Sequence, residues 1–448
     1  MSLLQITDNH DWKRYTDCIK DLCTDDSDLE NLQKIANVDI GKLNLDDNPN
    51  LLIFPKDFDH YGDEISENFI ISLQDNRIST GNIMGFVGVN ETQIDIKSRF
   101  DKEDNNDYFM HYMLQKVFSI NLFDIKHTTN RETIFDFLLY LFPHFLKTAL
   151  RQGVFKKYQK FEYNDANIRG PININRHIKE NIPFRGTVSY STREHSYDNQ
   201  ITQLIRHTIE YIRTKEEGYL ILNNDMETKG CISQIRLATQ TYNSRERQNI
   251  INKNLRPIHH PYYTAYTALQ KLCLQILRHE SIKYGQEKDK VYGVLFDGAW
   301  LWEEYLNTIL HQFGFKHPQN KKKKGGIPMF DRPEEYEQFS KNSKMLYPDF
   351  YKDNYILDAK YKHLNSGVGR EDLYQVITYM FCTKAKNGVY VYPYKIDSEP
   401  QTYRLTNRGY DGDIHVIPYY IPQKCANWSD FYEKIEISTQ KLTNYLFH

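Results

Sequence analysis

The feature that most constrains this chain lies in its last third, where helical and extended patterns follow one another in a fixed order. The expected elements are a helix at 300–313, strands at 347–351 and 355–361, a helix at 370–386 and a strand at 389–394. The two helices have apolar residues at three- and four-residue spacing, and the turn pair Asp353-Asn354 joins the first two strands. This helix–strand–strand–helix–strand series predicts a compact α/β domain.

Two acids and a lysine lie on the first two of these strands. Asp349 follows Pro348 on one strand, while Asp358 and Lys360 flank Ala359 on the next. Side chains two residues apart in a strand point to the same face, so Asp358 and Lys360 project together. Because the chain turns back between the strands, we expect Asp349 to lie beside Asp358. Two carboxylates next to a lysine predict a site for Mg²⁺, or for Mn²⁺, which also prefers oxygen ligands.

This set of residue types suits the hydrolysis of a phosphodiester. A metal held by Asp349 and Asp358 lowers the pKa of bound water and neutralises phosphate oxygens. Lys360 would orient the nucleophile or stabilise the charge that develops in the transition state. The backbone carbonyl of Ala359 is a further candidate metal ligand.

The helix before the strands offers another acid. Its apolar stripe places Glu303 and Glu304 near the edge of the buried face, where one of them could face the metal. We favour Glu303 as a catalytic residue and metal ligand, with Glu304 in reserve; the alternative for either is a solvated helix face. Gln375, in the following helix, is a candidate polar contact to the site, although an exposed helical glutamine is commoner.

A run of four lysines, Lys321, Lys322, Lys323 and Lys324, precedes the strands. Runs of like charge usually mark solvated, flexible loops. Beside a nuclease site these lysines could instead contact the DNA backbone without reading its sequence. Both readings stay open.

An Asp-x-Lys strand end alone usually forms a surface ion pair of little energetic value. The complete order is more specific. Pro348-Asp349, then Asp358-Ala359-Lys360, with a glutamate-bearing helix before them and a helix and strand after them, resembles the PD-(D/E)xK nuclease pattern.

The length of 448 residues predicts more than one domain. We expect a mixed α/β domain at 1–107, an α-rich connecting domain at 108–285, and a restriction-endonuclease-like α/β core at 286–448. The six cysteines form no CxxC pair, and no apolar run reaches the roughly 20 residues of a membrane span. These features predict a cytoplasmic protein without a membrane segment. The net charge of −2 requires any DNA-binding surface to concentrate its positive charge locally.

Several further segments, in their order and spacing, resemble the McrC family, the nuclease subunit of McrBC-type restriction systems. They are 78–89, 94–97, 151–158, 168–173, 176–178, Asn181 and 197–199. The first ~60 residues show no such resemblance.

The resemblance implies a partner and a division of labour. McrC-like subunits act with a hexameric AAA+ GTPase, McrB, which they bind and stimulate through their N-terminal part. The GTPase recognises modified cytosine in double-stranded DNA, and the McrC subunit cuts. The sequence contains no G-x-x-x-x-G-K-[ST] loop, as expected for the subunit that lacks the motor.

Two other functions compete with the endonuclease. One is a scaffold that activates the GTPase ring without cutting, and the other is a stand-alone repair nuclease. The intact Asp349, Asp358 and Lys360 set argues against the scaffold, and the long portion outside the nuclease core argues against the stand-alone enzyme. The modification recognised, the stoichiometry with the motor, and the pairing of two copies to cut both strands lie beyond the sequence.

Overall fold

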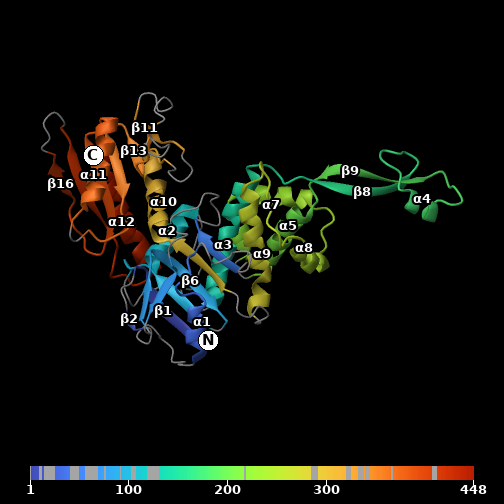
Figure 1. Cartoon of the computed structure of the whole chain (residues 1–448), viewed down its shortest axis with the longest axis horizontal. Coiled ribbons are helices and arrows are strands. Elements are labelled where there is room, and N and C mark those ends of the chain that lie inside the picture. The colour runs from blue at the N-terminus through green and yellow to red at the C-terminus, as the bar shows by residue number, and fades with distance from the viewer. Residues whose placement is uncertain are drawn as a thin grey trace. The chain divides into compact units, whose positions relative to one another are not determined.

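The structure is a computed structural model in which the chain forms two compact units (Figure 1). Unit 1 contains residues 1–130 and 285–448, and unit 2 contains residues 131–284. The residues that the structure describes are 2–9, 13–14, 26–40, 50–55, 69–74, 77–90, 92–101, 107–118, 131–215, 218–223, 225–283, 291–318, 324–330, 338, 344–364, 367–405 and 411–447.

Unit 1 contains a five-stranded sheet built from both ends of the chain. In spatial order its strands are β1 (Ser2–Thr7), β7 (Thr92–Lys97), β6 (Ile83–Val89), β10 (Val291–Asp297) and β3 (Asn50–Phe54). The first part of the chain is mixed α/β as predicted, with α1 (Asp26–Gln33) packed on this sheet. The strand β10 lies between β6 and β3, although the sequence separates it widely from both.

The pairing of β6 with β10 depends on two glycines. Gly85 has φ +121° and Gly293 has φ +154°, values that other residues rarely adopt. A Cβ atom on Gly85 would lie 2.2 Å from the Val294 carbonyl oxygen, and one on Gly293 would lie 2.3 Å from that of Phe86. Any side chain at either position would therefore force the two strands apart.

The second large sheet of unit 1 contains the elements predicted in the last third of the chain. Its order is β13 (Phe350–Lys352), β14 (Tyr355–Ala359), β15 (Asn387–Tyr394), β17 (Asp413–Tyr420) and β16 (Gln401–Arg404). The helix α10 (Gly298–Leu310) precedes these strands, and α11 (Arg370–Thr383) connects β14 to β15. The predicted helix–strand–strand–helix–strand series is thus confirmed.

Helices cover both faces of this second sheet. On one face, Val376 and Met380 of α11 pack with Ile356 and Tyr390. On the other face, the Tyr419 ring lies 5.4 Å from that of Trp302 in α10, and its hydroxyl donates to a carbonyl of α12 (Trp428–Phe447). Because both faces are covered, side chains at the ends of the strands are partly withdrawn from solvent.

The N-terminal sheet holds the end of β14 in place. The hydroxyls of Ser98 and Tyr361 lie 2.9 Å apart, and Arg99 donates to the Tyr361 carbonyl at 2.9 Å. The segment that we expected to begin a connecting domain, α2 (Tyr108–Phe118), packs on α10 within the same unit. The compact units therefore do not coincide with the three consecutive domains expected from the sequence, because residues 1–130 and 285–448 together form one unit.

Unit 2 is a helical body with a long two-stranded arm (Figure 1). The α-rich character expected of this part of the chain is present in helices such as α5 (Gln200–Arg213) and α9 (Ala265–Lys283). They pack with α3 (Arg131–Leu150) and α7 (Met226–Ala238). The arm consists of β8 (Lys157–Asp165) paired with β9 (Val188–Ser196), and the helical patterns of the sequence did not predict it.

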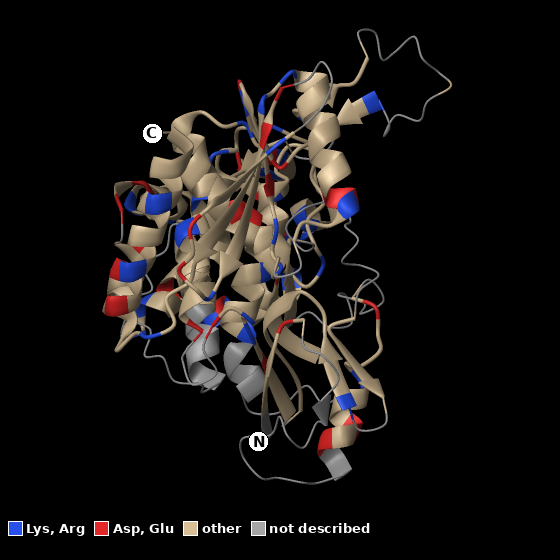
Figure 2. Cartoon of the chain, turned by 90° about the vertical axis from the view of Figure 1, so that its left-hand side faces the viewer, with Lys and Arg blue, Asp and Glu red and all other residues tan. Residues whose placement is uncertain are grey.

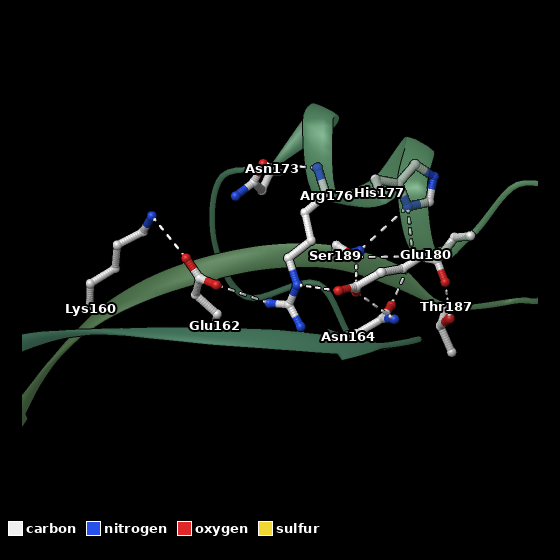
Figure 3. A network of polar contacts seen from close by, with 10 residues as sticks. Lys160, Glu162, Asn164, Asn173, Arg176, His177, Glu180, Thr187 and Ser189 are labelled. Carbon is white, nitrogen blue, oxygen red and sulfur yellow. Dashed lines mark hydrogen bonds and ion pairs between the residues drawn. The ribbon is translucent and has the colours of Figure 1, made fainter.

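A polar network orders the far end of this arm, around α4 (Ile174–Glu180) (Figure 3). The Asn181 side chain donates to Asn164 and Ser189 and accepts from Thr187. Arg176 bridges Glu180 at 2.8 Å and Glu162 at 3.4 Å. A hairpin alone is marginally stable in water, so these hydrogen bonds and ion pairs stabilise the end of the arm.

Within the described residues, no helix is both long and apolar enough to cross a membrane.

Candidate functional site

The hairpin of β13 and β14 brings the two predicted aspartates together. Its two-residue turn is made possible by Asp353, which has φ +40°. Phe350 pairs with Leu357, so the preceding Asp349 lies opposite Asp358. One carboxylate oxygen of Asp349 accepts a hydrogen bond of 2.7 Å from the Ala359 amide. The proximity inferred from the sequence is therefore present.

The electrostatics of this pair are those of crowded carboxylates. Burial raises the pKa of Asp349 well above its usual range, and the charges of Glu303 and Asp358 raise it further. Burial also raises the pKa of Asp358, while the Lys360 ammonium opposes that shift. A cation between these carboxylates would relieve their repulsion.

Lys360 lies between two carboxylates. Its Nζ is 2.9 Å from Asp358 Oδ2 and 3.0 Å from Asp372 Oδ1. Burial lowers the pKa of Lys360, but the two acids outweigh that effect and raise it, so the ammonium stays charged. Asp372 lies in the first turn of α11, and its other oxygen is 2.7 Å from Lys362 Nζ. Sequence reasoning missed Asp372, because an acid at a helix start ordinarily only complements the helix dipole.

The structure distinguishes Glu303 from Glu304. The charge of Glu303 raises the pKa of Asp349, whereas Glu304 lies 3.7 Å from His317 Nε2. His317, which the sequence did not single out, donates from Nδ1 to the Asp349 carbonyl at 2.7 Å and lies 3.7 Å from Glu303. Burial lowers the pKa of His317, but Glu304, that carbonyl and Glu303 together raise it to about 9.

The remaining predicted contacts lie further out. Gln375 is exposed and donates to the Tyr379 hydroxyl at 2.9 Å. Burial raises the pKa of Tyr379, and the negative charges of Asp349 and Asp358 raise it further. Lys324 is exposed. Lys321, Lys322 and Lys323 lie outside the described residues.

The sequence left open where a DNA-binding surface would concentrate positive charge. In Figure 2, basic and acidic residues are interspersed along the described helices and strands. Lys360 places a positive charge beside Asp358, and Lys362 places one beside Asp372.

The donor set fits a hard cation. Asp349, Asp358 and Glu303 would supply carboxylate oxygens to such a cation, and Ala359, between Asp358 and Lys360, would supply a backbone carbonyl. As they stand, the described side chains include no cluster of three His, Cys, Asp or Glu placed to hold a metal ion. Mg²⁺ does not require one, since it is commonly bound through one or two carboxylates with water and substrate phosphates.

Comparisons with known proteins place this geometry in context. The whole fold resembles a chain in the half-complex from a tetradecameric assembly of Thermococcus gammatolerans McrB AAA+ hexamers with bound McrC. The TM-score is 0.52 at 16% identity, and the alignment covers 99% of this chain and 100% of that one. A second structure, of the Thermococcus gammatolerans McrBC complex, aligns with a TM-score of 0.35 at 15% identity over 69% of this chain and 87% of that one. No curated protein matches the sequence.

The fold is thus that of a chain from a restriction complex. Residues 78–393 match the family described as McrBC 5-methylcytosine restriction system component. The chain belongs to this family, and the resemblance drawn from the sequence is confirmed.

Proposed function

We propose that this chain is the McrC-type subunit of its restriction system and cleaves DNA with a metal-dependent PD-(D/E)xK site. The observation that carries the proposal is the convergence of Asp349, Asp358 and Lys360 at a partly buried sheet edge. Family membership supplies the substrate class, and the lack of a nucleotide-binding loop favours the cutting subunit over the motor.

In this proposal Asp349, Asp358, Glu303 and the Ala359 carbonyl hold Mg²⁺, for which Mn²⁺ could substitute. The bound metal would lower the pKa of a water molecule and neutralise phosphate oxygens. Lys360 keeps its positive charge beside Asp358, so it can stabilise the negative charge that develops on the phosphate. Glu304, which like Glu303 lies 3.7 Å from His317, remains the reserve candidate.

We also propose that the chain works with a hexameric AAA+ GTPase, which it stimulates, on double-stranded DNA containing modified cytosine. The similar half-complex contains McrB hexamers with bound McrC, and the two chains align over nearly their full length. The free thiols of Cys231, Cys273, Cys382 and Cys425 agree with a reducing cytoplasm.

The deciding experiment is cleavage of cytosine-methylated and unmethylated plasmid by the purified chain with Mg²⁺, with and without the GTPase and GTP. Cutting that requires methylation, GTPase and GTP supports the proposal. Cutting by the chain alone would instead identify a stand-alone nuclease. Stimulated GTP hydrolysis without cutting under any metal condition would leave a scaffold.

Besides the N-terminal part, to which the family resemblance assigns the GTPase contact, the far end of the arm in unit 2 offers a second surface for this partner. It exposes large apolar side chains, namely Ile168, Ile172, Ile174, Ile178, Ile182 and Phe184. Ile174 and Ile178 are one helical turn apart on α4, and the polar network of Figure 3 holds that helix to the hairpin. Clustered exposed apolar residues are typical of protein–protein contacts.

Replacing Ile174 and Phe184 together by serine is expected to weaken binding to the GTPase about 10-fold or more, since apolar anchors dominate interface energy. The melting temperature should stay unchanged because these side chains are 67% and 69% exposed. Surface-immobilised GTPase hexamer would report the affinity. Ile437→Ser, at a residue 53% exposed on α12, is the matched control. Wild-type affinity in the double variant would exclude the arm end as the contact.

A further inference from the structure

The first turn of α11 places a second carboxylate, Asp372, beside the lysine of the site. Asp372 Oδ1 lies 3.0 Å from Lys360 Nζ, about as close as Asp358 Oδ2 at 2.9 Å. The Lys360 side chain is only 18% exposed and therefore poorly solvated. Asp358 and Asp372 are the acids that the structure places in contact with its ammonium. A lysine side chain has several rotatable bonds and gains a defined position only when such partners fix it.

Asp372 is itself held from three sides. Its Oδ2 accepts from Lys362 Nζ at 2.7 Å, and its backbone carbonyl accepts from the Tyr390 hydroxyl at 2.8 Å. Tyr390 is fully buried and pairs with Asp358 in the register of β14 and β15. The carboxylate is therefore anchored to the same sheet that carries the two aspartates.

The two acids on Lys360 have different roles in the proposed chemistry. Asp358 is a candidate metal ligand, and a metal at that carboxylate would compete with Lys360 for its oxygens. Asp372 lies on the other side of the ammonium, on a helix, and is no part of the donor set. A bond to Asp372 can thus persist when Asp358 turns to a cation.

We propose that Asp372 is a positioning residue for Lys360: it holds the ammonium beside the phosphate position when Asp358 ligates the metal. This inference rests on the proposed nuclease function. Lys362, whose side chain is 49% exposed, completes the anchor by fixing the second oxygen of Asp372. Asp372 itself touches neither metal nor DNA.

The test is Asp372→Asn in the full chain, assayed with the GTPase, GTP and Mg²⁺ on methylated duplex under single-turnover conditions. The rate constant for cutting should fall about 10- to 100-fold, the loss typical of a misplaced catalytic group. The dissociation constant for DNA should stay near that of the wild type, and Asp372→Glu, which keeps the charge, should recover most of the rate. Asp397→Asn is the control, since Asp397 pairs with Lys441 at 2.8 Å elsewhere in the unit.

A second measurement does not depend on cutting. Acetylation of lysines followed by mass spectrometry should show Lys360 becoming several-fold more reactive in Asp372→Asn, relative to the exposed Lys384. Cutting at the wild-type rate by Asp372→Asn overturns the inference, as does a loss explained wholly by weaker DNA binding. If Asp372→Asn fails to fold, Lys362→Ala, which releases the second oxygen of Asp372, decides by the same two readouts, with a slower cut and a more reactive Lys360 expected. If the wild type does not cut, the proposed function fails, and unchanged Lys360 reactivity then separately overturns the positioning role.

Discussion

Lys360→Ala is expected to lower the single-turnover rate of DNA cleavage by about 10²- to 10³-fold or more, the loss seen when a preorganised charge is removed from a transition state. The reason lies in its surroundings. The Lys360 side chain is only 18% exposed, and its ammonium remains charged beside Asp358 and Asp372, so it acts at low effective dielectric. Binding to the GTPase should be unaffected, because Lys360 lies in neither of the two proposed contacts, the N-terminal part and the arm of unit 2.

Removing this lysine leaves two acids without their shared cation, and an uncompensated buried charge destabilises a fold. Lys360→Met, which keeps the aliphatic volume, separates loss of chemistry from loss of packing. Lys441→Ala removes an exposed lysine from its pair with Asp397 and is the matched control. Melting curves and GTPase binding would accompany each rate. A Lys360→Ala protein that still cuts at the wild-type rate would show that the site is wrongly assigned.

Asp349→Asn is expected to abolish metal-dependent cutting and yet to stabilise the metal-free protein increasingly as the pH rises. Folding raises the pKa of Asp349 above 3.8, so the folded chain binds this proton more tightly than the unfolded chain. The contribution of Asp349 to stability is therefore largest at low pH and declines as the pH rises through the folded pKa. The amide stays neutral and can still accept from the Ala359 amide, so it avoids that decline.

The measurement is thermal unfolding of wild type and Asp349→Asn between about pH 5 and 8, with and without Mg²⁺. The advantage of the variant should grow with pH in the absence of metal. Mg²⁺ should stabilise the wild type, because it binds the folded site, and should do so much less in the variant. A pH-independent difference, or equal shifts with Mg²⁺ in both proteins, would contradict the assignment of Asp349 as a ligand.

The part of the site that the sequence predicted is the part encoded locally. Asp349, Asp358 and Lys360 lie on one hairpin, and the turn at Asp353 together with strand alternation fixes their relation. Asp372 escaped prediction because its contact depends on how α11 crosses the sheet. His317 escaped because it lies outside regular structure, between α10 and β13, where no periodicity indicates direction.

The same distinction between locally encoded features and contacts between distant segments applies to the fold. Helices such as α5, with a buried stripe from Ile201 to Ile212, follow directly from apolar spacing. The strands of the arm do not, because β8 alternates only between exposed and half-exposed residues and has no buried residue that would mark one face as apolar. The place of β10 beside β3 could not be predicted, since pairing between distant segments leaves no local trace.

The insertion of β10 into the N-terminal sheet has a consequence for synthesis on the ribosome. Until residues 291–297 have emerged, β3 and β6 lack the strand that separates them, and each presents an unpaired edge. Unit 2 is synthesised before residues 291–297, so it can fold before the sheet of unit 1 is complete. A fragment ending before residue 285 would keep both edges open and be prone to aggregate. A fragment that retains the complete sheet of unit 1 must therefore contain both flanking segments, 1–130 and 285–448, with a short linker in place of 131–284.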